Sequence, residues 1–225
     1  MYATAEAGTA HRLRSRLLLC IVAVALGVAA SSAEAGQEAE PDDPRQSVNR
    51  TAAIGGLIAG ALTGFAAHEG GHLLFNVIFD ADPGVKRVEF GGIPFFAITH
   101  RSDLSPKQEF AVSSAGFWVQ NATNEWLLTS RPRLRSERNP YLKGIFAFNL
   151  AASGMYSVAA FARIGPDERD TRGMAVSSGT EEPWIGAVVL LPAALDAWRY
   201  LDPDAELPKW LSRAAKVGAV LLVLR

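Results

Sequence analysis

The segment HEGGH, residues 68–72, combines two histidines and a glutamate at a spacing that suits metal chemistry. On a helix, His68 and His72 lie four residues apart on one face, so both imidazoles can reach the same ion. Glu69 projects roughly a hundred degrees away, close enough to contact a metal-bound water without being a ligand. In this H-E-x-x-H arrangement, zinc lowers the pKa of the water and the glutamate takes its proton. The pattern therefore predicts zinc-dependent hydrolysis of a peptide bond.

A catalytic zinc ion needs three protein ligands, and the chain offers few candidates for the third. The only cysteine, Cys20, lies in the N-terminal apolar run, which leaves histidines and carboxylates. We expect Asp196, because a carboxylate that faces the histidines would offset the cost of an acid in an apolar block. The alternatives are that Asp196 pairs with Arg199 at the end of a span, or that Glu125 is the ligand instead. His100 is expected to be solvated.

The chain as a whole has the composition of a membrane protein rather than that of a nucleic-acid-binding protein. Its 225 residues suit one domain, and the 22 basic and 23 acidic residues nearly cancel. Without a basic surface, no nucleic-acid partner is expected. Hydrophobic residues make up 49% of the chain and are gathered into long blocks between charged connectors. This distribution is typical of a chain that crosses a bilayer several times.

The N-terminal part has the layout of a secretory signal. An arginine-rich start precedes an apolar run at 17–30 and a small-x-small pattern that ends at Ala35. We interpret residues 1–35 as a signal peptide, with an uncleaved signal anchor as the alternative. Residues 36–50 form a polar linker, and residues 51–225 form the membrane-embedded metalloprotease-like domain.

The apolar blocks predict a mainly α, polytopic membrane protein with about four transmembrane helices. The first block contains HEGGH and is followed by short apolar alternations around a Gly-Gly pair, which predict a β-hairpin. The last block is weak because basic residues interrupt it. The blocks cover residues 51–79, 110–128, 141–164, 184–201 and 210–224.

Two further features concern the connectors and the membrane boundaries. The polar loop at 166–174 is interpreted as a solvated connector, the alternative being that Asp170 and Arg172 touch substrate. Tryptophans near the ends of the blocks are interpreted as interfacial anchors; they are Trp184, Trp198 and Trp210.

The sequence indications of membrane orientation disagree. The positive-inside rule places the arginine-rich loop 131–138 in the cytoplasm. An exported N-terminus followed by two spans would place the same loop on the outer side. The expected location is a membrane, with multiple spans, and a bacterial inner membrane fits best.

In their order along the chain, four segments resemble motifs of the site-2 protease family of intramembrane zinc metalloproteases. They cover most of the chain after residue 51. The segments are HEGGH in the first core span, GVKRVEFGGIPFF after it, SAGFWVQN, and LLPAALDA.

The resemblance implies roles for individual residues. His68 and His72 would be zinc ligands, Glu69 the general base and Asp196 the third ligand, with Asn121 close to the substrate backbone. The substrate would be a transmembrane helix of another membrane protein, or the margin of such a helix, cut where it unwinds.

Two other hypotheses stay open at this point. One is an exported zincin that rests on the membrane surface and uses Glu125 as its third ligand. The other is a catalytically inactive membrane scaffold that keeps the protease fold. Two apolar blocks lie between HEGGH and Asp196 where the family core has one, and two intervening spans would make the HEGGH and Asp196 helices antiparallel.

Overall fold

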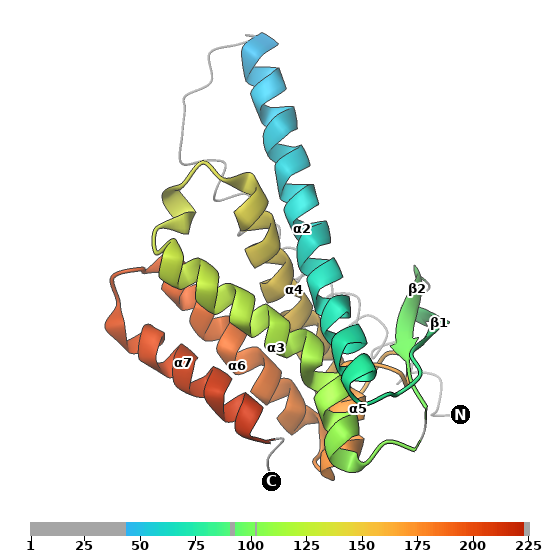
Figure 1. Ribbon diagram of the computed structural model, residues 1–225. Coiled ribbons are helices and arrows are strands. Elements are labelled where there is room, and N and C mark those ends of the chain that lie inside the picture. The colour runs from blue at the N-terminus through green and yellow to red at the C-terminus, as the bar shows by residue number, and fades with distance from the viewer. Residues whose placement is uncertain (1–43, 91–92, 102, 223–225) are drawn as a thin grey trace, which may run out of the picture.

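Long helices form most of the computed structural model, which describes residues 44–90, 93–101 and 103–222 (Figure 1). The expected mainly helical class is confirmed. The predicted signal peptide lies outside the described residues. In chain order, the helices are α2 (Pro44–Ile78), α3 (Pro106–Ser130), a short 3-10 helix (Leu134–Ser136), α4 (Pro140–Ala162), α5 (Asp170–Ser178), α6 (Glu182–Leu201) and α7 (Glu206–Leu221).

A two-stranded antiparallel hairpin follows α2, as the sequence predicts. It pairs β1 (Gly84–Phe90) with β2 (Ile93–Thr99), with Gly84 opposite Thr99 and Phe90 opposite Ile93. In Figure 1 the hairpin lies beside the C-terminal end of α2. The HEGGH segment therefore ends close to the only sheet of the described residues.

Glycines allow α2 and α4 to approach closely and in parallel. Successive contacts advance along both helices, since Gly56 meets Pro140 and Gly64 meets Phe148. A Cβ atom on Gly144 would fall on the backbone of Leu57. Small residues at such positions let the backbones of membrane helices pack tightly.

Helix α6 runs antiparallel to α4, and therefore also to α2. Gly186, near the start of α6, packs against Ser157 near the end of α4. At the other end of the pair, Tyr200 stacks on Phe146 with the ring centroids 4.9 Å apart. Helix α6 therefore extends from one end of the bundle to the other.

The helices enclose two separate apolar clusters. One includes Phe110, Phe117 and Ile185, with Tyr156 packed against it, and lies near the HEGGH segment. The other includes Leu127 and Phe146 at the opposite end of the bundle. Each cluster joins residues of α3 and α6, so both ends of the bundle are fixed by apolar burial.

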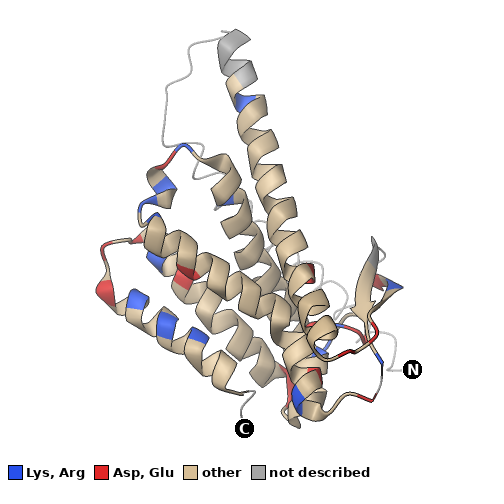
Figure 2. Ribbon diagram, in the orientation of Figure 1, with Lys and Arg blue, Asp and Glu red and all other residues tan. Residues whose placement is uncertain are grey.

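Three of the described helices are long and apolar enough to cross a membrane: Asn49–Ile78, Pro140–Ala162 and Glu182–Leu201. Figure 2 shows that charged residues are sparse along these helices and gather in the connectors and on α7. The expected number of about four spans is not confirmed. The 110–128 block does form a helix within α3, but its buried face is polar at Gln120 and Asn124.

The packing of α2 on α4 yields a stability prediction. Gly144→Ala should lower the free energy of unfolding by about 1–3 kcal/mol, because the added methyl group overlaps the Leu57 backbone and the helices must separate. Gly154→Ala, in the same helix but with open space at its Cβ position, should be neutral or stabilising. Thermal unfolding in mild detergent compares the two; equal losses would contradict the proposed close contact.

Candidate metal centre

Helix α2 holds the two histidines of HEGGH in the interior of the bundle. His68 is 2% exposed and His72 is 6% exposed, and their Nε2 atoms lie 3.2 Å apart. The histidines thus share one helix face, as their spacing predicts. Gly116 of α3 makes room for them, because a Cβ atom there would overlap the His68 ring.

The third group at this point is Asp170, the first residue of α5. Its Oδ2 atom lies 3.1 Å from Nε2 of His68 and 3.3 Å from Nε2 of His72. These three residues form the group of histidine and acidic side chains that could hold a metal ion among the described residues. The candidate metal site thus draws on α2 and on the short helix α5, whose Asp170 comes 102 positions after His68.

The charge state of Asp170 suits a ligand. Burial raises the pKa of its carboxyl, but the positive charge of the His72 and His68 rings when they are protonated, and their hydrogen bonds, outweigh burial and hold that pKa well below its usual range. Asp170 is therefore ionised, which is the form that binds a cation. An Asp side chain at the first turn of a helix is also favoured by the positive end of the helix dipole.

The second nitrogen of His72 fixes the orientation of that ring. Its Nδ1 atom lies 2.8 Å from the carbonyl oxygen of Val112 on α3 and donates to it. This contact leaves the Nε2 lone pair facing His68 and Asp170, which is the arrangement that metal-binding histidines adopt. The His68 ring is held differently, by stacking on Tyr156 with the ring centroids 5.9 Å apart.

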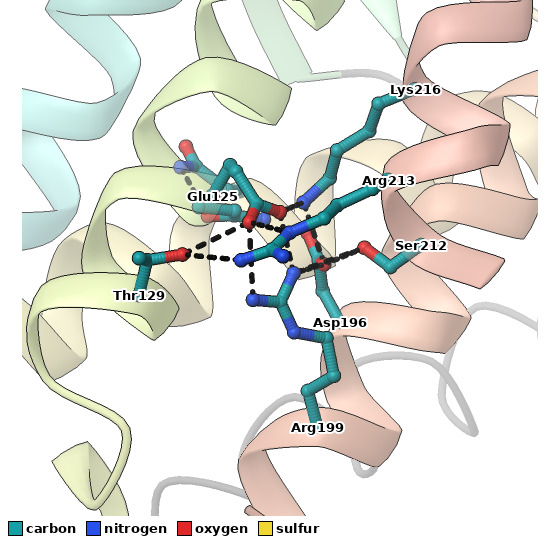
Figure 3. Close-up of polar contacts among 9 residues, drawn as sticks. Glu125, Thr129, Asp196, Arg199, Ser212, Arg213 and Lys216 are labelled. Atoms are coloured by element: carbon teal, nitrogen blue, oxygen red, sulfur yellow. Dashed lines mark hydrogen bonds and ion pairs between the residues drawn. The ribbon is translucent and has the colours of Figure 1, made fainter. Parts of the chain in front are cut away.

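The structure does not bring Asp196 to the histidines, so the expectation of Asp196 as third ligand is corrected. Because α6 runs antiparallel to α2, Asp196 lies toward the opposite end of the bundle. There, its Oδ1 atom accepts hydrogen bonds from Ser212 at 2.6 Å and from Lys216 at 2.8 Å (Figure 3). The cost of burying this acid is offset by the ammonium group of Lys216 rather than by a metal ion.

The alternative ligand Glu125 lies in the same distant cluster. Its carboxylate accepts hydrogen bonds from Arg199, Arg213 and Lys216 (Figure 3). It therefore has no place in the metal centre, and the surface zincin hypothesis loses its third ligand. Asn121 is half-buried on α3 and is not among the residues that line the cavity beside the histidines.

The loop at 166–174, interpreted from sequence as a solvated connector, is instead fixed to the bundle interior. The Nε and Nη2 atoms of Arg169 donate to the two oxygens of Glu182 at 2.7 and 2.6 Å. Thr171 donates to the same carboxylate at 3.0 Å. Residues on both sides of Asp170 thus bind Glu182, which we interpret as the anchor that positions Asp170. The sequence indicated Asp170 only as a residue of this polar loop that could touch substrate.

His100, expected to be solvated, is half-buried and pairs with Glu109, with Nε2 of His100 2.5 Å from Oε2 of Glu109. Ser113 donates to the other oxygen of Glu109 at 3.1 Å. Glu109 precedes Val112 by three residues along α3, so this contact fixes the start of α3, whose Val112 carbonyl accepts a hydrogen bond from His72. His100 itself does not contact the metal ligands.

A cavity of about 390 Å³ opens beside His68, His72 and Asp170. Its walls come from α2, α4, the hairpin and the loop before α5, and they are mostly apolar. Glu69 lines the cavity, and it makes no hydrogen bond or ion pair among the described residues. The apolar lining includes Phe65, Val88, Phe96, Ile98, Phe148, Ala152 and Met155.

Comparison with known proteins adds no assignment. Neither a scan against protein-family models nor searches of curated proteins and solved structures finds a match to this chain.

The ligand set leads to a metal-binding prediction. We expect Asp170→Ala to lose zinc, because two imidazoles alone leave the ion with too few protein ligands. Asp196→Ala, which removes a fully buried acid elsewhere in the bundle, should retain about one zinc per chain. Elemental analysis of detergent-purified protein measures both. Loss of zinc in the Asp196 variant together with retention in the Asp170 variant would reverse the assignment.

The anchoring by Glu182 can be tested separately. Glu182→Gln should weaken zinc binding roughly ten- to a hundredfold. The substitution weakens the contacts that hold Arg169 and Thr171, the neighbours of Asp170, to the start of α6. Glu125→Gln is the matched control, since it also removes a carboxylate from a buried arginine but lies far from the histidines. Competition with a zinc chelator gives the affinities. Equal losses in the two variants would mean that Glu182 acts only through general stability.

Proposed function

We propose that this chain is a zinc-dependent endopeptidase that hydrolyses peptide bonds in or near transmembrane segments of membrane proteins. The supporting observation is the spacing of the three ligand atoms of His68, His72 and Asp170, which lie 3.1 to 3.3 Å from one another. Tetrahedral zinc with ligands at about 2.0–2.1 Å has ligand separations of about 3.3 Å. The spacing therefore suits one zinc ion.

The chemistry of the donors favours zinc over harder cations. Two imidazoles and one carboxylate are ligands that zinc commonly takes, and three protein ligands leave a position open for water or substrate. Calcium and magnesium prefer six or more oxygen ligands, or several retained waters. The single cysteine of the chain, Cys20, lies far from HEGGH in the sequence, so thiolate-bound metal centres with several cysteines are excluded.

Glu69 is the general base of the proposed reaction. When bound, zinc supplies a Lewis acid that polarises the peptide carbonyl and acidifies water. Glu69 takes the proton from the attacking water and passes it to the leaving amine. Its carboxylate is free for this role, because it makes no hydrogen bond or ion pair within the described structure. The apolar cavity walls limit access of bulk water and strengthen the electrostatic interactions inside.

The proposed substrate follows from the position and lining of the cavity. The cavity lies beside HEGGH in the candidate span Asn49–Ile78, and Phe148 and Met155 of a second candidate span also line it. Apolar walls accommodate the side chains of a transmembrane segment. We infer a multi-pass protein of a bacterial inner membrane that acts on other membrane proteins.

The proposed enzyme is a divergent relative of the site-2 proteases. It keeps HEGGH and the following hairpin, but its third ligand comes from α5 rather than from the LLPAALDA segment. The extra helix between HEGGH and that segment accounts for the change, because it turns Asp196 toward the opposite end of the bundle.

An inactive membrane scaffold is the second candidate function. It is favoured by the contacts among His68, His72 and Asp170, which stabilise one another as a buried polar cluster even without a metal ion. It leaves Glu69 unexplained, since an acid that lines an apolar cavity without a hydrogen-bond partner destabilises the fold.

Glu69→Gln distinguishes the two candidates. The variant should lose hydrolysis by roughly a hundredfold or more while it retains zinc and its melting temperature, because the amide cannot accept the proton of water. Cleavage of a quenched fluorescent peptide that contains a transmembrane segment, in detergent or in nanodiscs, measures the loss. Glu137→Gln, in the distant arginine-rich connector, serves as control. Undiminished cleavage by the Glu69 variant would remove Glu69 as the base.

A further inference from the structure

Helix α7 has the reverse of the polarity expected for a helix in water. Its polar residues Ser212 and Lys216 are 0% and 8% exposed and face the bundle. Its large apolar residues instead point outward: Leu207, Trp210, Leu211, Val217, Val220 and Leu221 are all exposed. A helix at an aqueous surface buries its apolar stripe and exposes its charges, so the outer face of α7 suits an apolar medium.

The charges on the inner side of α7 are compensated within the bundle. Figure 3 shows Arg213 and Lys216 directed toward Glu125 of α3, at 2.8 and 2.9 Å from its carboxylate oxygens. Lys216 also donates to Asp196 of α6. Ionisable side chains that are paired in this way are tolerated inside a membrane, whereas unpaired ones are costly.

Three exposed tryptophans are close in sequence to residues of this cluster. Trp126 directly follows Glu125, and Trp198 directly precedes Arg199. Trp210 is one turn before Arg213, whose guanidinium lies 5.7 Å from the centroid of the Trp210 ring. Because ion pairs hold these segments of α3, α6 and α7 together, the tryptophans form a belt of the kind found at membrane interfaces.

A neighbouring helix also has exposed apolar side chains. Helix α6 is a candidate membrane span that packs against α7. Its Leu190, Leu191 and Leu201 side chains are exposed like the outer residues of α7. Both helices therefore present outward apolar side chains that suit contact with lipid.

We propose that α7 lies in the bilayer, with its outer face against lipid acyl chains and the tryptophan belt of Trp126, Trp198 and Trp210 at the headgroup level. At 16 residues the helix is about 24 Å long, shorter than the roughly 30 Å hydrocarbon layer. Length and composition alone therefore do not identify it as a span. The cluster around Glu125 is the internal contact that carries its charges. This inference does not rest on the proposed peptidase activity.

Paramagnetic accessibility tests the proposal in the intact chain, in lipid nanodiscs. In a background with Cys20→Ser, a nitroxide is attached at Val217→Cys on the outer face of α7, which is 59% exposed. The control is Val176→Cys on α5, a valine that is 73% exposed and lies near the exposed Arg172 and Thr180. Oxygen concentrates in acyl chains, while a water-soluble nickel chelate does not enter them.

We expect the label at position 217 to collide at least severalfold more with oxygen than with the nickel chelate, and the label at position 176 to show the reverse preference. Preferential contact of position 217 with nickel would overturn the proposal, because the helix would face water. Low accessibility to both reagents would also overturn it and would indicate that protein, such as a second copy of this chain, covers α7. Val220→Cys repeats the measurement if the first variant does not fold.

Discussion

The contact of one carboxylate with two imidazoles is the interaction on which the rest of the site depends. His68 and His72 are fixed by a single helix, but Asp170 reaches them only through a series of packed elements. Helix α3 lies against α2 where Gly71 meets Ala115, and against α5 where Gly173 meets Ser113. Glu182 then joins both flanks of Asp170 to α6. A shift of any of these helices would move the carboxylate away from the histidines.

The local features of the site were predictable from sequence. The spacing of His68 and His72 corresponds to about one helical turn, so one periodicity fixes their common face. The hairpin was equally local, because two apolar alternations flank a Gly-Gly pair. The helical class followed from the long apolar blocks. Such features depend on neighbours a few residues away, and no tertiary contact is needed to recognise them.

The acid that lies beside the histidines, Asp170, is brought there by contacts between distant segments and was not predicted. An acid in an apolar block needs compensation, and for Asp196 that expectation was sound, but the partner is Lys216 of α7 rather than a metal ion. Asp170 was considered only as a residue that could touch substrate, because its loop contains many charges and resembled a solvated connector. The sequence could not show that Arg169 and Glu182 neutralise each other in the interior. The sequence did contain two apolar blocks between HEGGH and Asp196, and two long intervening helices make the HEGGH and Asp196 helices antiparallel, which turns Asp196 away from the histidines.

The most direct measurement of the proposed centre is anomalous diffraction at the zinc absorption edge, from crystals of the zinc-loaded protein. We expect one anomalous peak within about 2.0–2.2 Å of Nε2 of His68, Nε2 of His72 and the carboxylate of Asp170. A peak elsewhere, such as beside Asp196, or no peak among these three residues, would contradict the metal centre.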